Sequence, residues 1–137
     1  MRKWIGIGLG GAAGAALRYL IRGVVFVTGT GGFPLNTLLI NVAGSFALSL
    51  LLTAAGGIFA LKPDLRLALT TGFLGAFTTF STVCREIALL LSAGSYGTAS
   101  LYALSTVLLG LLAAYLGYAI GNRIPAVQKT PEEEAEE

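Results

Sequence analysis

Two long stretches of this chain contain no charged residue, and they limit the possible folds more than any other feature. They cover residues 23–61 and 87–122. Each is longer than the roughly 20 residues that a helix needs to cross a bilayer. Only 12% of all residues are charged, compared with about 25% in a typical soluble domain. We therefore predict an all-α integral membrane protein with no separate soluble domain.

Four transmembrane helices fit this charge pattern best. A short charged turn, residues 61–66, separates the second span from the third, and a polar loop, residues 92–100, separates the third from the fourth. Residues 1–124 are expected to form one transmembrane domain, and residues 125–137 a disordered acidic tail. The predicted spans cover approximately residues 4–21, 35–59, 67–91 and 101–121.

The distribution of lysine and arginine predicts the orientation. With four spans, both termini and the turn at 61–66 lie on one side of the membrane. That side carries most of the cationic residues, whereas the opposite side has Arg22 and, near the end of the first span, Arg18. Cytoplasmic loops are enriched in lysine and arginine. Both termini are therefore expected in the cytoplasm.

Residues 70–82 are unusual for a membrane span. Six of these thirteen residues carry hydroxyl groups, three are phenylalanines, and Gly72 and Gly75 permit irregular backbone. Irregular backbone at membrane depth is tolerated only where protein or a water-lined path surrounds it. We predict that the third helix is broken in mid-membrane and that the break forms a site for a small ion or solute.

Uncharged donors accompany this stretch. Asn41 lies within the uncharged second span, with Thr37 one turn earlier on the same face. Its amide either makes an interhelical hydrogen bond or donates to a passing anion. The positive ring edge of Phe80 is also suited to an anion. The hydroxyls near Phe80 either line the path or bond to carbonyls of their own helix.

Other polar groups leave alternatives open. The carbonyls exposed by a broken helix can coordinate a cation. Arg18 either has a partner inside the membrane or extends to its surface. Glu86 is a candidate for a vestibule. In the fourth span, Tyr102, Ser105 and Thr106 either join the donors or satisfy one another.

Small residues recur every four positions in the first and last spans. They are Gly6, Gly10 and Gly14, and Ala113, Gly117 and Gly121. This spacing lets helices approach closely, either within one chain or between chains. Because four short spans make a thin bundle for enclosing a pore, we expect a dimer.

Three stretches of the chain resemble the small bacterial fluoride channels of the Fluc or CrcB family. They are Gly-Gly-Ala-Ala-Gly-Ala-Ala-Leu-Arg-Tyr at residues 10–19, residues 37–46 around Asn41, and Gly-Phe-Leu-Gly-Ala-Phe-Thr-Thr-Phe-Ser-Thr at residues 72–82. The last is the most specific. The resemblance covers nearly the whole chain except the tail.

The resemblance implies an antiparallel dimer with two pores, which lets fluoride leave the cytoplasm passively and relieves its toxicity. Asn41 would donate its amide to the pore, and Phe80 would present its ring edge. The Gly75 and Thr78 carbonyls would hold a sodium ion at the dimer centre, and Arg18 would support the vestibule or the subunit packing. Further polar pore lining would come from Thr37, Ser81, Thr82, Tyr102 and Thr106.

Two positions depart from the family pattern. Val83 stands where a second ring-edge phenylalanine is usual, and Asn36 replaces a glycine. An antiparallel homodimer also requires a subunit that inserts both ways, whereas the lysine and arginine bias here is strong. The partner is therefore either a second copy or a related, oppositely oriented chain, and this chain could be only an accessory subunit.

Other classes of protein find little support. A small proton-coupled multidrug antiporter needs a carboxylate deep in an early span, and no acidic residue precedes Asp64. The net charge of +2, without a basic cluster, gives no reason to expect a nucleic-acid partner. The chain has no histidine for acid–base catalysis, and we do not expect an enzyme.

Overall fold

The computed structural model describes residues 2–24, 32–54 and 61–124, and all regular structure within these ranges is helical. The predicted acidic tail, and the end of the second span at residue 59, lie outside the described residues. The prediction of an all-α chain with four potential membrane spans is confirmed. The helices long and apolar enough to cross a membrane are Lys3–Gly23, Leu35–Ala54, Pro63–Ser92 and Tyr96–Gly121.

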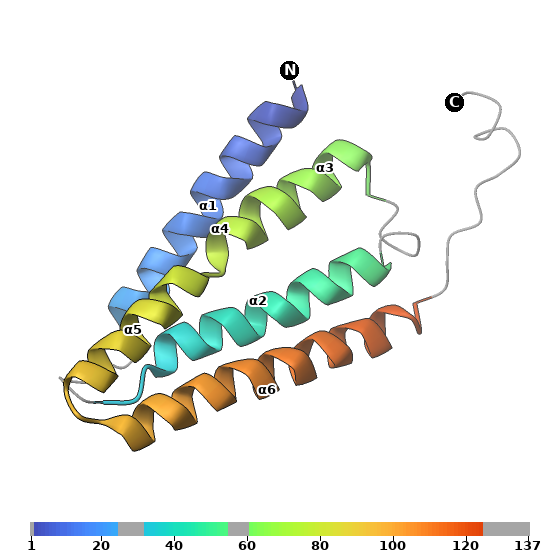
Figure 1. Cartoon of the computed structure of the whole chain (residues 1–137). Helices are drawn as coiled ribbons and strands as arrows, with labels where there is room; N and C mark the ends of the chain where they lie inside the picture. Colours follow the sequence, from blue (N-terminus) through green and yellow to red (C-terminus); the bar gives the residue numbers. More distant parts are fainter. Residues whose placement is uncertain (1, 25–31, 55–60, 125–137) are drawn as a thin grey trace, which may run out of the picture.

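The spans lie side by side in two pairs (Figure 1). Helix α1 packs along the first half of the third span, which comprises α3, the π-helical segment η1 and α4. Helix α2 packs along α6, and α5 completes the third span and contacts α6. The bounds are α1 Arg2–Val24, α2 Leu35–Ala54, α3 Pro63–Leu67, η1 Ala68–Leu74, α4 Gly75–Phe77, α5 Phe80–Ser92 and α6 Tyr96–Gly121.

The recurring small residues serve packing within this chain. A Cβ atom on Gly14 would collide with the backbone carbonyl of Phe73 in η1. A Cβ atom on Gly117 would collide with the carbonyl of Phe46 in α2. Since water supplies no hydrophobic drive between helices in a membrane, such close backbone contact contributes directly to their association.

The predicted loop at residues 92–100 is wrong, because α6 begins at Tyr96. Gly94 adopts a φ of 73°, a left-handed conformation that ends α5 abruptly. The Ser95 N–H donates to Leu90 O at 2.9 Å, and the Ser95 carbonyl already accepts from Ala99 N at 3.0 Å. The turn is therefore short, and its polar residues belong partly to the helix.

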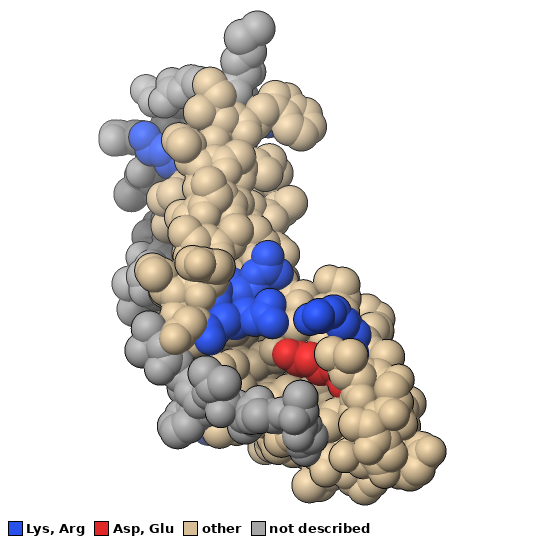
Figure 2. Space-filling model, turned by 90° about the vertical axis from the view of Figure 1, so that its left-hand side faces the viewer, with Lys and Arg blue, Asp and Glu red and all other residues tan. Residues whose placement is uncertain are grey.

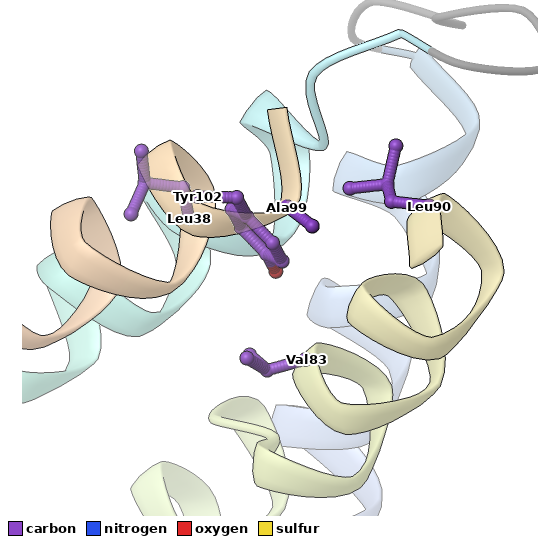
Figure 3. Close-up of a cluster of buried hydrophobic side chains, with 5 residues drawn as sticks. All are labelled: Leu38, Val83, Leu90, Ala99 and Tyr102. Carbon is purple, nitrogen blue, oxygen red and sulfur yellow. The ribbon is translucent and has the colours of Figure 1, made fainter. Parts of the chain in front are cut away.

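A buried cluster lies between α2, α5 and α6. Its members are Leu38, Val83, Leu90, Ala99 and Tyr102 (Figure 3). The outer faces of the helices are apolar but exposed, and Leu108 and Leu111 of α6 are examples, at 62% and 66%. This distribution is typical of spans that face lipid or another subunit rather than water.

Candidate functional site

Two residues of extended backbone interrupt the third span. Helix α4 ends at Phe77, and α5 begins at Phe80. Between them, Thr78 has φ −76° and ψ 160°, and Thr79 has φ −153° and ψ 119°. The π-helical η1 ends at Leu74, with the short α4 between it and the interruption, and such segments are common near functional sites. The interruption falls within the polar stretch at residues 70–82.

Asn41 pairs with the interruption through both ends of its side-chain amide. Its Nδ2 donates to Thr79 O at 2.9 Å, and the Thr79 N–H donates to its Oδ1 at 2.8 Å. In an unbroken α-helix the Thr79 N–H would donate to Gly75 O instead. Asn41 on α2 therefore replaces a helical hydrogen bond. The amide NH₂ has two hydrogens, and this pairing uses one of them.

The hydroxyl residues around the interruption have different roles. Thr79 is the N-cap of α5, since its Oγ1 accepts from Thr82 N at 3.2 Å. The same oxygen lies 3.3 Å from Ser81 Oγ and 2.9 Å from Thr82 Oγ1. In contrast, Thr78 Oγ1 donates to Leu74 O of its own helix at 3.0 Å. Three hydroxyls therefore form one connected group at the start of α5.

Glu86 is the centre of a second polar group. Thr37 Oγ1 donates to Glu86 Oε1 at 2.8 Å, and the Tyr102 hydroxyl donates to Oε2 at 2.7 Å. Thr37 and Tyr102 are almost completely buried. Thr106 Oγ1 donates to Tyr102 O at 2.8 Å, within α6. The sequence offered Glu86 only as a vestibule candidate, because its partners lie 49 and 16 residues away along the chain.

Phe80 and Val83 differ sharply in exposure although both belong to α5. The Phe80 side chain is 79% exposed, whereas Val83 is 4% exposed. Val83 packs in the buried cluster with Leu38 and Tyr102 (Figure 3). It therefore lies beside the group formed by Thr37, Glu86 and Tyr102. Phe80 makes no comparable contact within the described part of one chain.

A polar cavity opens between α1 and the start of α5. Its volume is about 340 Å³. Arg18 reaches inward from α1, and its Nη1 lies 3.5 Å from Thr78 O. The sequence left open whether Arg18 has a partner inside the membrane or extends to its surface. The structure gives it a partner at the level of the interruption. The cavity is lined by Ala15, Arg18, Tyr19, Arg22, Thr79, Ser81 and Thr82.

The carbonyls of Gly75 and Thr78 have lost their helical donors. The Thr79 N–H, which would serve Gly75 O in an α-helix, donates to Asn41. The Thr82 N–H, which would serve Thr78 O, donates to Thr79 Oγ1. Two backbone oxygens at the interruption are thus freed from the helical ladder. Among the described residues there is no cluster of acidic or cysteine side chains that could hold a metal ion.

Comparison with known proteins identifies the family. The family described as "CrcB-like protein, Camphor Resistance (CrcB)" matches residues 5–118. The chain belongs to the CrcB-like family. With its four apolar spans, this CrcB-like chain is a multi-pass membrane protein.

Several relatives carry the name fluoride-specific ion channel FluC. The Acidobacterium capsulatum protein is 44% identical over 90% of this CrcB-like chain and 99% of its own length. The protein of Nitratidesulfovibrio vulgaris is 40% identical over 90% of this chain and its own full length. That of Thermus thermophilus is 42% identical over 90% of this chain and 98% of its own length.

Proposed function

We propose that this chain forms a fluoride-selective channel that lets fluoride leave the cytoplasm passively and so relieves its toxicity. The observation that carries the proposal is the shared name of relatives that are 40% and 44% identical over nearly their whole lengths. The geometry supports it, because the interrupted span gathers uncharged donors without a metal-binding or catalytic cluster among the described residues.

The chemistry of these donors suits a small, strongly hydrated anion. An ion that enters a narrow path must exchange its water for other donors, and it must not be held too tightly to leave. The second Nδ2 hydrogen of Asn41 supplies one such donor. One of the hydroxyls of Ser81 and Thr82 supplies another, because Thr79 Oγ1 can donate its hydrogen to only one of them. The exposed ring of Phe80 supplies a positive edge. The carboxylate of Glu86 would repel an anion, but both of its oxygens are already bonded to the hydroxyls of Thr37 and Tyr102.

The channel is proposed to be an antiparallel dimer with two pores. Phe80 is 79% exposed in a single chain, and a second subunit packed on this face would enclose its ring. The partner is either another copy or a related chain of opposite orientation. The strong lysine and arginine bias of this sequence favours the related chain. It also supports a plasma-membrane protein with both termini in the cytoplasm.

A structural sodium ion is proposed at the centre of this dimer. The freed carbonyls of Gly75 and Thr78 are hard oxygen donors, of the kind that unwound helices use for sodium. They fit as half of a site that a second subunit would complete. Arg18 competes for Thr78 O at 3.5 Å, so that carbonyl must use its second lone pair for the ion. When bound, sodium would supply fixed positive charge between the subunits.

Fluoride efflux from liposomes tests the function. Liposomes that contain the purified protein and are loaded with fluoride should release it when the counter-ion is free to move, with no need for a proton gradient. A requirement for a proton gradient would support the antiporter. Efflux that appears only after addition of a related subunit would assign this chain the accessory role.

A further inference from the structure

The beginnings of α1 and of the third span lie next to each other. The two helices run in the same direction, because a Cβ atom on Gly6 would meet Ala68 and one on Gly14 would meet Phe73. Helix α1 also contacts α3 directly. The fold therefore brings together the first turns of two helices that are far apart in the sequence.

Cationic side chains gather at this shared end of the two helices. Lys3 on α1, Lys62 at the N-cap of α3 and Arg66 within α3 are all exposed. Asp64 is the only acidic residue of α1 and α3, and none of the three cations forms an ion pair with a described residue. Figure 2 shows basic side chains near the end of the molecule where α1 begins, well away from the acidic side chains visible on that face. This end therefore carries an excess of positive charge.

Aromatic and apolar side chains accompany these cations. Lys3 Nζ lies 5.7 Å from the centroid of the Trp4 ring, which is itself 69% exposed. Tryptophan is enriched at the level of the lipid headgroups, where its amphipathic ring meets both water and hydrocarbon. The neighbouring Ile5 and Leu65 are also exposed. The surface thus offers charge for a headgroup and apolar area for acyl chains, and a free inorganic anion has no use for the second.

We propose that this end of α1 and α3 is a binding surface for anionic phospholipids. The negative phosphodiester group would lie among Lys3, Lys62 and Arg66, and the acyl chains would lie along Trp4 and the exposed apolar side chains next to it. Basic clusters directly beside a membrane span attract anionic lipids, which are abundant in the cytoplasmic leaflet. The orientation proposed above places this end of the molecule at that leaflet. The inference goes beyond the proposed function and does not depend on which ion the chain conducts.

Fluorescence quenching tests the proposal without any measurement of flux. Trp4 is the only tryptophan of the chain, so its emission reports on the lipids at this surface. The full chain is reconstituted in phosphatidylcholine bilayers that contain a fixed share of phosphatidylglycerol or of phosphatidylcholine, brominated near the headgroup end of the acyl chains. Brominated phosphatidylglycerol should quench Trp4 more strongly than the same share of brominated phosphatidylcholine. The preference should weaken at about 1 M salt, where the Debye length falls to roughly 3 Å.

Three variants assign the preference to this surface. Arg66→Gln should lower the preference for phosphatidylglycerol about fivefold at low ionic strength, the order expected for one cation at a membrane surface. Arg66→Lys should behave like the parent protein. Arg85→Gln, which removes an exposed cation from α5 in the other half of the third span, is the matched control. Equal quenching of the parent by the two lipids, or an unchanged preference in Arg66→Gln, would overturn the proposal. So would a Trp4 that neither lipid quenches, because protein would then cover the surface.

Discussion

The side chain of Asn41 lies beside the interruption and also holds its irregular backbone in place by hydrogen bonds. Its amide replaces a backbone hydrogen bond by accepting from Thr79 N and donating to Thr79 O. An aspartate at this position keeps only the acceptor, and it places a negative oxygen against the Thr79 carbonyl. The position therefore depends on the amide chemistry rather than on the size of the side chain.

We predict that Asn41→Asp abolishes fluoride efflux. The substitution loses one hydrogen bond to the interruption and puts a negative charge beside an anion path. Efflux from liposomes measures the effect, and Thr53→Val is the control, because the Thr53 hydroxyl donates to Ser49 O of its own helix. Efflux at the parental rate in Asn41→Asp would remove Asn41 from the mechanism.

The hydroxyl of Tyr102 is predicted to stabilise the fold through Glu86. Tyr102→Phe removes a buried donor from a carboxylate, and hydrogen bonds to charged groups are worth about 1.5–3 kcal/mol. The midpoint of thermal unfolding in detergent should fall accordingly. Tyr115, on the same helix, is 65% exposed, so Tyr115→Phe should leave the midpoint unchanged. Equal midpoints for the two variants would contradict this role for the hydroxyl.

Val83 is buried against Leu38 and Tyr102. This packing favours a structure built around valine rather than around the phenylalanine that is usual in the family. Val83→Phe adds a ring to a site that is 4% exposed, and overpacking typically costs about 1–3 kcal/mol. We expect a lower unfolding temperature and lower fluoride efflux. An increase in efflux without loss of stability would show instead that the phenylalanine completes the pore.

At the scale of elements, the pairing of α1 with η1 depends on close backbone contact. Gly14→Ala would place a Cβ atom against the Phe73 carbonyl, whereas a Cβ atom on Gly8, in the same helix, meets nothing within 4 Å. Gly14→Ala should therefore reduce thermal stability. Gly8→Ala should maintain or slightly raise it, by up to about 1 kcal/mol from helix propensity. Similar unfolding temperatures in the two variants would contradict the packing.

The spans could be predicted from the sequence because the length of an uncharged stretch can be read directly from consecutive residues. The start of α6 could not, because Tyr96, Thr98 and Ser100 appear polar and only the left-handed Gly94 turn shows that the helix begins early. The partners of Glu86 and Asn41 come from other helices. The spacing of residues along the sequence does not indicate contacts between different helices. The hydrogen bonds from Thr37 and Tyr102 to Glu86 were therefore not predicted.

At the scale of the whole molecule, the proposed channel requires a second subunit. The helices form two pairs rather than a closed bundle (Figure 1), and Phe80 is left exposed at the interruption. Both features are explained if a second subunit covers this face. The small-residue spacing gives no support for such an interface, because Gly14 and Gly117 are used within the chain.

The central claim is passive conduction of fluoride, and a fluoride electrode tests it most directly. The purified protein is reconstituted in fluoride-loaded liposomes, alone and together with its oppositely oriented relative where the host encodes one. We predict rapid efflux once the membrane potential is released, unchanged by a proton gradient. Efflux no faster than from protein-free liposomes, in both preparations and with correctly folded protein, would contradict the account.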